Sequence, residues 1–307
     1  MKNNQVLVRV YYSGLNPLDS RTATDPSVRF LLNYHLPHIL GNDFAGEIVA
    51  TNPNSKFKKG QRVFGLVNYQ NIGTFAEFIA VDEKDIALIP DNISYQEAAI
   101  TPLVSLTAYQ ALHDLMKLKK GQKIFIEAGA GGVGSVAIIL AKRFGAYVAT
   151  TAGNGSEFVK KLGADKIIDY HKEDFSTLLH NYDAALISKK EDLEKAFKIL
   201  RPNGNLVTLN GIPTQKTIDQ LKITGIKKFL LNIAAFREKH LAKKTHVNFN
   251  FLFVQANGQE LSKIATLLEK QELKINIAKI YSLDNLVTAM KDLDQHNTHG
   301  KIVIQIN

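Results

Sequence analysis

A glycine-rich turn between an apolar strand and an amphipathic helix constrains the fold of this chain more than any other feature. Residues Lys123–Ala128 form the short apolar run of a buried strand. Gly129, Gly131 and Gly134 follow it at the G-x-G-x-x-G spacing. Apolar residues then recur at helical intervals up to Gly145, which is placed to end a helix. This order predicts a backbone cradle for a pyrophosphate at the N-terminus of a helix.

The periodicity of the apolar residues divides the chain into three segments. Residues 1–97 are strands and turns, including VLVRVYYSG, DFAGEIVA, QRVFGLV and TFAEFIAV, separated by Gly, Asn and Pro. In residues 98–270 helices alternate with short apolar strands, which predicts a parallel sheet covered by helices on both faces. Residues 271–307 add a helix and a closing strand. The predicted fold class is α/β, with a doubly wound parallel sheet and a second domain rich in strands.

An acidic residue is missing where a site for NAD normally needs one. NAD-preferring sites place Asp or Glu about 20 residues beyond the glycines to bind the ribose 2′-hydroxyl, but none lies between Glu127 and Glu157. The second strand ends instead at Thr151, followed by Ser156 and Lys160. Small hydroxyl groups and a lysine suit a 2′-phosphate, although a solvated helix face explains Lys160 equally well. We therefore predict NADPH as the cofactor.

Composition excludes several other kinds of chemistry. The chain has no cysteine, which rules out disulfides, a thiolate nucleophile and zinc sites ligated by cysteine. Its net charge of +9 comes from dispersed lysine pairs such as Lys189-Lys190 without interleaved aromatic residues, so a solvated surface is favoured over nucleic-acid binding. There is no long uncharged apolar run and no apolar leader. We expect no metal, no nucleic-acid or membrane partner, and a cytoplasmic location.

The stretches LVSLTAYQAL, GQKIFIEAGAGGVGSVAIILAKRFGA and LGADKIIDY together resemble the medium-chain dehydrogenase/reductase superfamily. Within it, the chain is similar to the zinc-free quinone oxidoreductases and enone reductases, from VLVRVYYSGLNPLD to GKIVIQIN. The resemblance implies a GroES-like β-barrel catalytic domain, split between residues 1–97 and 271–307, and a Rossmann domain over residues 98–270. Members usually begin with about two further strands before the segment equivalent to NQVLVRV. We therefore expect either that the start has been lost or misassigned, or that the catalytic domain lacks an edge hairpin and one wall of its barrel is short.

The resemblance also implies site residues. Zinc-dependent members carry Gly-His-Glu where this chain has Gly41-Asn42-Asp43, which argues against zinc. Asn16 matches an asparagine near the nicotinamide, although a turn-forming role before proline explains it equally well. Tyr170 is expected near the 2′-phosphate, or else as a half-buried aromatic at a strand end. The expected cofactor contacts are Asn16, Thr107, Gly129, Ala130, Gly131, Gly132, Val133, Gly134, Thr151, Ser156, Lys160, Tyr170, Asn210, Gly211 and Phe253. The expected substrate pocket contains Asn16, Asp43, Tyr69 and Phe251.

Without a metal, the electron acceptor must spread the charge that it receives. A quinone or an α,β-unsaturated carbonyl does so, and hydrogen-bond donors such as Asn16, Tyr69 or backbone N–H groups then suffice as the oxyanion site. Apolar packing is the alternative role for Tyr69. We assign no general acid, because solvent can supply the final proton. The alternatives are a non-catalytic NADPH-binding sensor or structural protein and, within enzymes, a reductase of acyl-thioester enones.

The sequence also predicts a homodimer. GNLVTLNG is expected to be a late strand of the parallel sheet, and HVNFNFLFV the next one outward. The outer strand alternates Val247, Phe249, Phe251 and Phe253, which is too apolar for an open edge in water. We expect two such edges to pair about a two-fold axis, as the resemblance implies. The alternative is that a helix or the catalytic domain covers this face.

Overall fold

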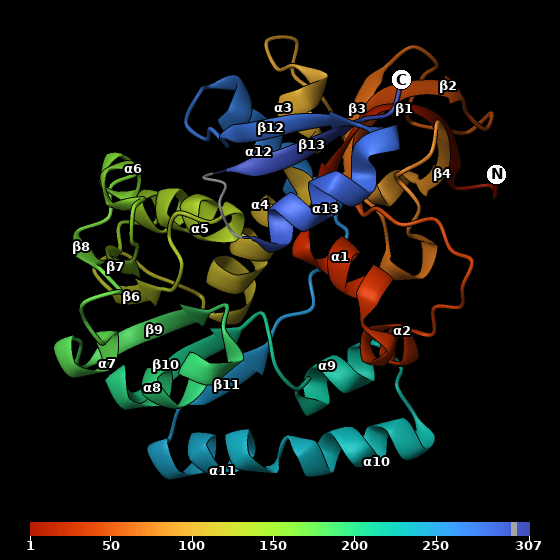
Figure 1. Cartoon of the computed structure of the whole chain (residues 1–307). Coiled ribbons are helices and arrows are strands. Elements are labelled where there is room, and N and C mark those ends of the chain that lie inside the picture. Colours follow the sequence, from red (N-terminus) through yellow and green to blue (C-terminus); the bar gives the residue numbers. More distant parts are fainter. Residues whose placement is uncertain (296–299) are drawn as a thin grey trace. The chain divides into compact units, whose positions relative to one another are not determined.

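The computed structural model describes residues 1–295 and 300–307, and the chain folds into two units (Figure 1). Unit 1 consists of Met1–Leu106 and Gln255–Asn307, and unit 2 consists of Thr107–Val254. Unit 1 therefore contains both ends of the chain, whereas unit 2 is one continuous segment that contains the glycine-rich turn.

Unit 2 is built on a six-stranded parallel sheet. Its strands are β6 (Lys123–Ile126), β7 (Tyr147–Thr151), β8 (Lys166–Ile168), β9 (Tyr182–Ile187), β10 (Leu200–Thr208) and β11 (Asn248–Phe251). The spatial order is β11-β10-β9-β6-β7-β8, so the direction of winding reverses between β6 and β9. This order confirms the predicted doubly wound sheet, whose ligands bind at the carboxyl ends of the strands near the reversal.

Helices connect the strands of unit 2, as the alternating pattern predicted. They are α5 (Gly132–Arg143), α6 (Ser156–Lys161), α7 (Phe175–Leu178), α8 (Leu193–Ile199), α9 (Gln215–Gln220), α10 (Gly225–Ala234) and α11 (Phe236–Thr245). A short turn of helix, η4 (Lys190–Asp192), precedes α8, while α4 (Pro102–Tyr109) and the π-helix η3 (Gln110–Leu115) precede β6. Phe125 on β6 is fully buried and stacks on Phe175, with ring centroids 4.4 Å apart. Strands buried in this way on both faces explain the continuous apolar runs in the sequence.

Unit 1 is a mainly antiparallel β structure. Its strands are β1 (Gln5–Leu15), β2 (Asp43–Ala50), β3 (Arg62–Leu66), β4 (Phe78–Asp82), β5 (Ile86–Leu88), β12 (Ile277–Ser282) and β13 (Lys301–Gln305). They run in the order β12-β13-β1-β2-β3-β5, with β4 also beside β1. Because β1 pairs with β2, β4 and β13, the first strand of the chain is hydrogen-bonded to the last. The inward side chains, among them Val8, Phe44 and Val63, form one apolar core.

The helices of unit 1 lie around this sheet. They are α1 (Pro17–Thr24), α2 (Pro26–Leu32), α3 (Tyr95–Ala99), α12 (Gly258–Glu269) and α13 (Leu286–Asp294), with the short helical turns η1 (Tyr69–Asn71), η2 (Glu83–Asp85) and η5 (Leu283–Asn285). In residues 1–295 and 300–307, no helix combines the length and the apolar character needed to cross a bilayer.

The unit boundaries differ from the ranges expected from the sequence, which were 98–270 for the dinucleotide-binding domain. The chain rejoins unit 1 at Gln255, before α12, because α12 packs on β5. A Cβ atom on Gly258 would lie closer than 3.0 Å to the carbonyl oxygen of Ile86. Glycine at this position therefore permits the close approach that ties α12 to unit 1.

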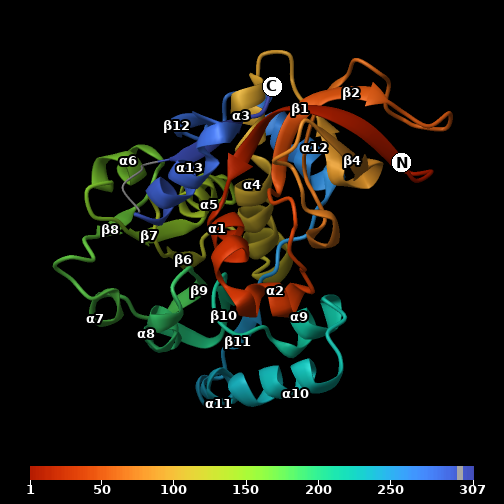
Figure 2. The same cartoon turned by 45° about the vertical axis from the view of Figure 1, so that its right-hand side comes forward.

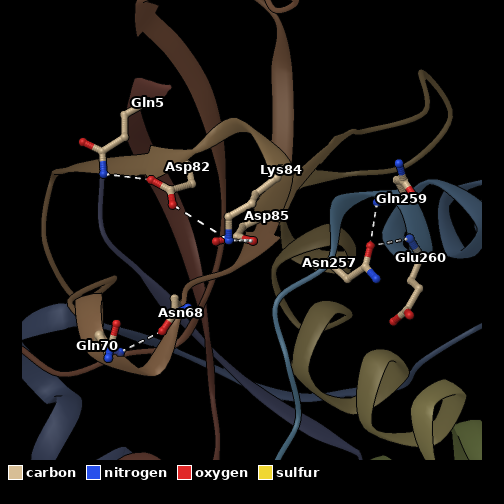
Figure 3. Close-up of polar contacts among 9 residues, drawn as sticks. All are labelled: Gln5, Asn68, Gln70, Asp82, Lys84, Asp85, Asn257, Gln259 and Glu260. Carbon is tan, nitrogen blue, oxygen red and sulfur yellow. Dashed lines mark hydrogen bonds and ion pairs between the residues drawn. The ribbon is translucent and has the colours of Figure 1, made fainter. Parts of the chain in front are cut away.

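Polar caps fix the start of α12 and the edge of the unit 1 sheet (Figure 3). The Asn257 side chain accepts hydrogen bonds from the N–H groups of Gln259 and Glu260, at 3.0 and 3.1 Å. Such an N-cap satisfies two of the N–H groups that a helix leaves without an acceptor. The Gln5 amide donates to Asp82 at 3.0 Å and so joins β1 to the end of β4.

Candidate functional site

The carboxyl edge of the unit 2 sheet gathers most of the predicted cofactor contacts. The glycine-rich turn follows β6, Thr151 ends β7, Tyr170 follows β8, Asn210 and Gly211 follow β10, and Phe253 follows β11. Because the six strands are parallel, all of these positions lie at the same edge of the sheet. The structure thus brings together residues that are spread over more than a hundred positions of the sequence.

The glycine-rich turn is a tight connection that only glycine allows. Gly131 N–H donates to the carbonyl oxygen of Ala128 at 2.9 Å, and Gly131 is the N-cap of α5 without any side-chain cap. A Cβ atom on Gly129 would lie closer than 3.0 Å to Thr150, and one on Gly134 closer than 3.0 Å to Ala128. The first N–H groups of α5 have no acceptor within the helix. Their positive potential and the bare backbone fit the phosphates of a dinucleotide.

The two hydroxyl residues predicted to meet the 2′-phosphate stabilise the neighbouring loops. Thr151 Oγ1 accepts a hydrogen bond from the Ala128 N–H at 2.9 Å, next to the glycine-rich turn. Ser156 Oγ donates to the carbonyl oxygen of Gly153 at 2.8 Å. Lys160 lies exposed in the last turn of α6. These two hydroxyl groups therefore stabilise the glycine-rich turn and the loop after β7.

A basic cluster that the sequence analysis missed lies beside Gly153. A Cβ atom on Gly153 would lie 2.8 Å from His171 Nε2 and 3.2 Å from the Tyr170 hydroxyl. The rings of Tyr170 and His171 have centroids 4.2 Å apart, and Lys189 Nζ lies 5.3 Å from the Tyr170 ring centroid. The ends of β8 and β9 thus bring a phenol, an imidazole and an ammonium group to the loop after β7. The sequence signal that could have indicated this cluster is the position of Lys189 just after an apolar strand.

Glu127 fixes the backbone that carries Lys189. The Ser188 N–H and hydroxyl donate to Glu127 Oε2 at 2.6 and 3.0 Å, and the Lys189 N–H donates to it at 2.8 Å. Burial raises the pKa of Glu127 to about 7. This carboxyl group therefore connects the start of the glycine-rich turn to the loop that follows β9.

Asn16 is the centre of a buried polar network in unit 1. Its Nδ2 donates to Asp43 Oδ2 at 3.0 Å and to the carbonyl oxygen of Gly14 at 3.2 Å. Its Oδ1 accepts a hydrogen bond from Lys301 Nζ. Its backbone N–H donates to Asp19 Oδ2 at 2.8 Å. Both amide protons and the amide oxygen of Asn16 are thus engaged by neighbours within unit 1.

Further bonds surround this network. Asn42 Nδ2 donates to Asp19 Oδ1 at 2.6 Å, the Leu103 N–H donates to Asp43 Oδ1 at 2.8 Å, and Lys301 Nζ also donates to the Leu15 carbonyl oxygen at 2.8 Å. Asp43 is 0% exposed and Lys301 5% exposed. Burial raises the pKa of Asp19 to about 6 and that of Asp43 to about 7, and it lowers the pKa of Lys301.

The other predicted substrate-pocket residues lie in separate elements. Tyr69 is half-buried on η1. The Asn68 side chain caps the start of η1 and accepts a hydrogen bond from the Gln70 N–H at 3.0 Å (Figure 3). The Tyr34 hydroxyl donates to the Tyr69 carbonyl oxygen. Phe251 ends β11 in unit 2, where its carbonyl oxygen accepts from Thr217 Oγ1 at 2.7 Å.

Thr107, a predicted cofactor contact, is buried on α4 at the start of unit 2. It therefore belongs to the unit that holds the glycine-rich turn.

Comparison with known proteins agrees with this architecture. Residues 2–91 match the alcohol dehydrogenase GroES-like domain, and residues 162–304 match a family described as zinc-binding dehydrogenase. The chain is 34% identical over 322 residues to the 2-methylene-furan-3-one reductase of Solanum lycopersicum, covering 99% of this chain and 72% of that protein. It is 30% identical over 322 residues to the chloroplastic NADPH-dependent alkenal/one oxidoreductase of Arabidopsis thaliana, with the same coverage. The quinone oxidoreductase from Coxiella burnetii superposes with a TM-score of 0.86 at 30% identity, covering 99% of this chain and 91% of that one.

A GroES-like unit and a doubly wound parallel sheet in one chain define the medium-chain dehydrogenases/reductases. This chain belongs to that superfamily, in the branch of the quinone and enone oxidoreductases, and it is an oxidoreductase of this type. The resemblance inferred from the sequence and the predicted GroES-like domain are thereby confirmed.

The zinc-binding description of one matching family does not suit the residues of this chain. Asn42 and Asp43 stand where zinc-dependent members carry His and Glu, and both are hydrogen-bonded within the network around Asn16. The Lys301 ammonium group in that network opposes a cation electrostatically. The chain has no cysteine, and residues 1–295 and 300–307 contain no group of three or more His, Asp or Glu placed to hold a metal ion. This donor set does not fit zinc.

Proposed function

We propose that this chain is an NADPH-dependent, zinc-independent reductase of quinones and α,β-unsaturated carbonyl compounds. The observation that supports it most directly is the cluster of His171, Lys189 and Tyr170 at the same sheet edge as the glycine-rich turn. When bound, NADPH supplies a hydride. The turn and the N-terminus of α5 bind the pyrophosphate, and the basic cluster binds the 2′-phosphate through charge-assisted hydrogen bonds.

The nature of the proposed acceptor follows from the described part of the chain, which contains no set of residues placed to hold a metal ion. Reduction of an isolated ketone places charge on one oxygen, which a metal normally stabilises. A quinone or enone spreads this charge, so that neutral hydrogen-bond donors suffice. We assign that role to the Tyr69 hydroxyl and to backbone N–H groups. We do not assign this role to Asn16, because its amide protons are already donated to Gly14 and Asp43 and its side chain is therefore held in place. Solvent supplies the final proton.

A steady-state screen of NADPH oxidation tests this function. Protein dialysed against a chelator is assayed with quinones, alkenals and cyclic enones, and we expect turnover that chelation leaves unchanged. Tyr69→Phe should lower kcat by about 100- to 1000-fold on the accepted substrate, while Tyr147→Phe, at an exposed position of unit 2, should have no effect. Tight NADPH binding without oxidation by any acceptor would support the non-catalytic alternative. Activity lost on chelation and restored by zinc would contradict zinc independence.

We also propose that the chain forms a homodimer through β11. This strand is the edge of the sheet, with β10 on one side and no described strand on the other. Val247 and Phe249 pack in the core of unit 2 itself, so the predicted alternation of apolar side chains alone does not require a partner. One outer group of β11, the Phe251 carbonyl oxygen, already accepts from Thr217 Oγ1. The other outer N–H and C=O groups of this edge strand are the reason for proposing pairing. Sedimentation equilibrium should give about twice the 34.1 kDa chain mass, and a monomer at micromolar concentration would reject the dimer.

A further inference from the structure

Helix α10 presents its apolar side chains to solvent. Ile226, Phe229, Leu230 and Ile233 are 66%, 60%, 53% and 58% exposed, and Phe236 at the start of α11 is 72% exposed. The first four recur at i, i+3, i+4 and i+7, so they lie on one face of the helix. No residue of α10 is buried. Figures 1 and 2 show α10 and α11 end to end along the outer side of unit 2. We call these five residues the apolar face.

The polar side of α10 makes the contacts with the rest of unit 2. Lys228 Nζ forms an ion pair with Asp219 of α9 at 2.9 Å. Asn232 Oδ1 accepts a hydrogen bond from Lys239 of α11 at 2.7 Å. A surface helix of a globular protein normally turns its apolar stripe to the core and its polar side to water. In α10 the apolar stripe is exposed instead, and a contiguous exposed patch of this kind marks an interaction surface.

The charge around the apolar face indicates what it binds. Residues 215–245 contain eight Lys or Arg and two Asp or Glu, a net charge of +6 out of +9 for the whole chain. The basic residues are Lys216, Lys222, Lys227, Lys228, Arg237, Lys239, Lys243 and Lys244. Two copies of so basic a surface repel each other, whereas an anionic surface attracts it. Exposed Phe, Leu and Ile flanked by lysines are the pattern of helices that lie in a membrane interface.

We propose that α10 and the start of α11 dock on an anionic lipid bilayer. The apolar face inserts at the level of the headgroups, and the flanking lysines contact the lipid phosphates. The chain then lies on the bilayer without spanning it. This differs from the sequence-based expectation of no membrane partner, which rested on the lack of a spanning run and of a leader. It is also independent of the proposed reductase activity, because it uses none of the residues assigned to the cofactor or the acceptor.

Co-sedimentation with vesicles tests the contribution of the apolar face. The full chain should bind vesicles of phosphatidylcholine mixed with phosphatidylglycerol, bind pure phosphatidylcholine far more weakly, and dissociate as salt is raised. The double variant Phe229→Ser/Ile233→Ser should reduce partitioning at least about tenfold, because it removes apolar area that inserts. The matched control, Ile280→Ser/Val287→Ser, changes two exposed apolar residues of unit 1, which are 51% and 67% exposed. It should bind as the unchanged chain does.

A second pair of variants tests the charge. Lys243→Glu/Lys244→Glu should weaken binding to the anionic vesicles at least about tenfold at low salt. Lys119→Glu/Lys120→Glu makes the same change of charge at an exposed lysine pair outside residues 215–245 and should have a much smaller effect. All substituted residues are exposed or half-buried, so the circular dichroism and melting temperature should stay unchanged.

Two outcomes would overturn the bilayer assignment. The first is that the unchanged chain fails to bind anionic vesicles, or that the Phe229→Ser/Ile233→Ser variant binds them equally well. The second is that this variant converts a dimer into a monomer in sedimentation equilibrium while no vesicle binds, which would assign the apolar face to a second copy of the chain.

Discussion

Replacing the buried Lys301 by methionine tests whether the polar network of unit 1 is the stabilising centre that its geometry suggests. The substitution keeps an unbranched side chain of similar length and removes the ammonium group. It leaves the Leu15 carbonyl oxygen and Asn16 Oδ1 without their donor. It also removes the positive charge that lowers the pKa values of Asp43 and Asp19.

The expected loss of stability on Lys301→Met follows from the burial of this lysine. Removing this buried donor leaves two desolvated oxygen acceptors unpaired, at about 1–3 kcal/mol each, so that Lys301→Met should cost roughly 3–5 kcal/mol. Lys142→Met is the matched control, because Lys142 forms a 2.7 Å ion pair with Asp165 while its side chain stays 34% exposed. A surface pair of this kind contributes about 0–1 kcal/mol. Both lysines donate two hydrogen bonds, Lys301 to neutral oxygens and Lys142 to a carboxylate, and they differ most in burial.

Urea unfolding followed by far-ultraviolet circular dichroism measures the difference. With an m-value of about 3 kcal/mol per molar urea, Lys301→Met should lower the midpoint of the unit 1 transition by roughly 1–1.5 M. Lys142→Met should shift unfolding by no more than about 0.3 M. If the two variants unfold at the same urea concentration, burial does not determine how much the polar network contributes to stability, and the interpretation of this network as a stabilising centre is wrong.

Three further predictions concern the cofactor site and pH. His171→Ala and Lys189→Ala should each weaken NADPH binding about tenfold in a fluorescence titration and leave NADH unchanged, with a smaller effect for Lys160→Ala; equal losses for both dinucleotides would contradict a 2′-phosphate role. Gly134→Ala should weaken both dinucleotides at least about tenfold, because its Cβ would lie closer than 3.0 Å to the glycine-rich turn; retained affinity in calorimetry would refute this. Asp43 has its folded pKa raised from 3.8 to about 7, so the folded state binds more protons and stability falls as pH rises between these values, by about 4 kcal/mol from this group. Asp43→Asn should flatten that part of a stability–pH curve, and an unchanged slope would refute the assignment.

The doubly wound half of the fold was predictable because its signals are local. Each strand and helix of unit 2 has its own periodicity, and Gly129, Gly131 and Gly134 mark the turn between β6 and α5. Once the strands are parallel, their carboxyl ends must share one edge, which placed Thr151 and Tyr170 beside the turn.

The polar network and the basic cluster were not predictable in the same way. Asn16 lies 27 residues from Asp43 and 285 residues from Lys301 in the sequence. No spacing rule connects such positions, since only the pairing of β1 with β2 and β13 brings them together. Lys189 likewise reaches Tyr170, the neighbour of His171, only because β8 and β9 end at the same edge.

The apolar face of α10 shows a different limit of sequence reasoning. The spacing of Ile226, Phe229, Leu230 and Ile233 indicates an amphipathic helix. Periodicity does not say which side faces the core, because an inward and an outward stripe have the same pattern. The exposed fractions of these four side chains, 53–66%, decide that the stripe faces outward.

Isotope transfer tests the proposed reaction most directly. NADPH carrying deuterium at the transferred C4 position is incubated with the chain and an enone that it reduces, and the product is analysed by nuclear magnetic resonance. We predict deuterium at the β-carbon of the saturated carbonyl product and a solvent-derived proton at the α-carbon, because the hydride reaches carbon directly and the enolate is protonated by water. A product without deuterium at the β-carbon, or no product from any quinone or enone tested, would contradict the account.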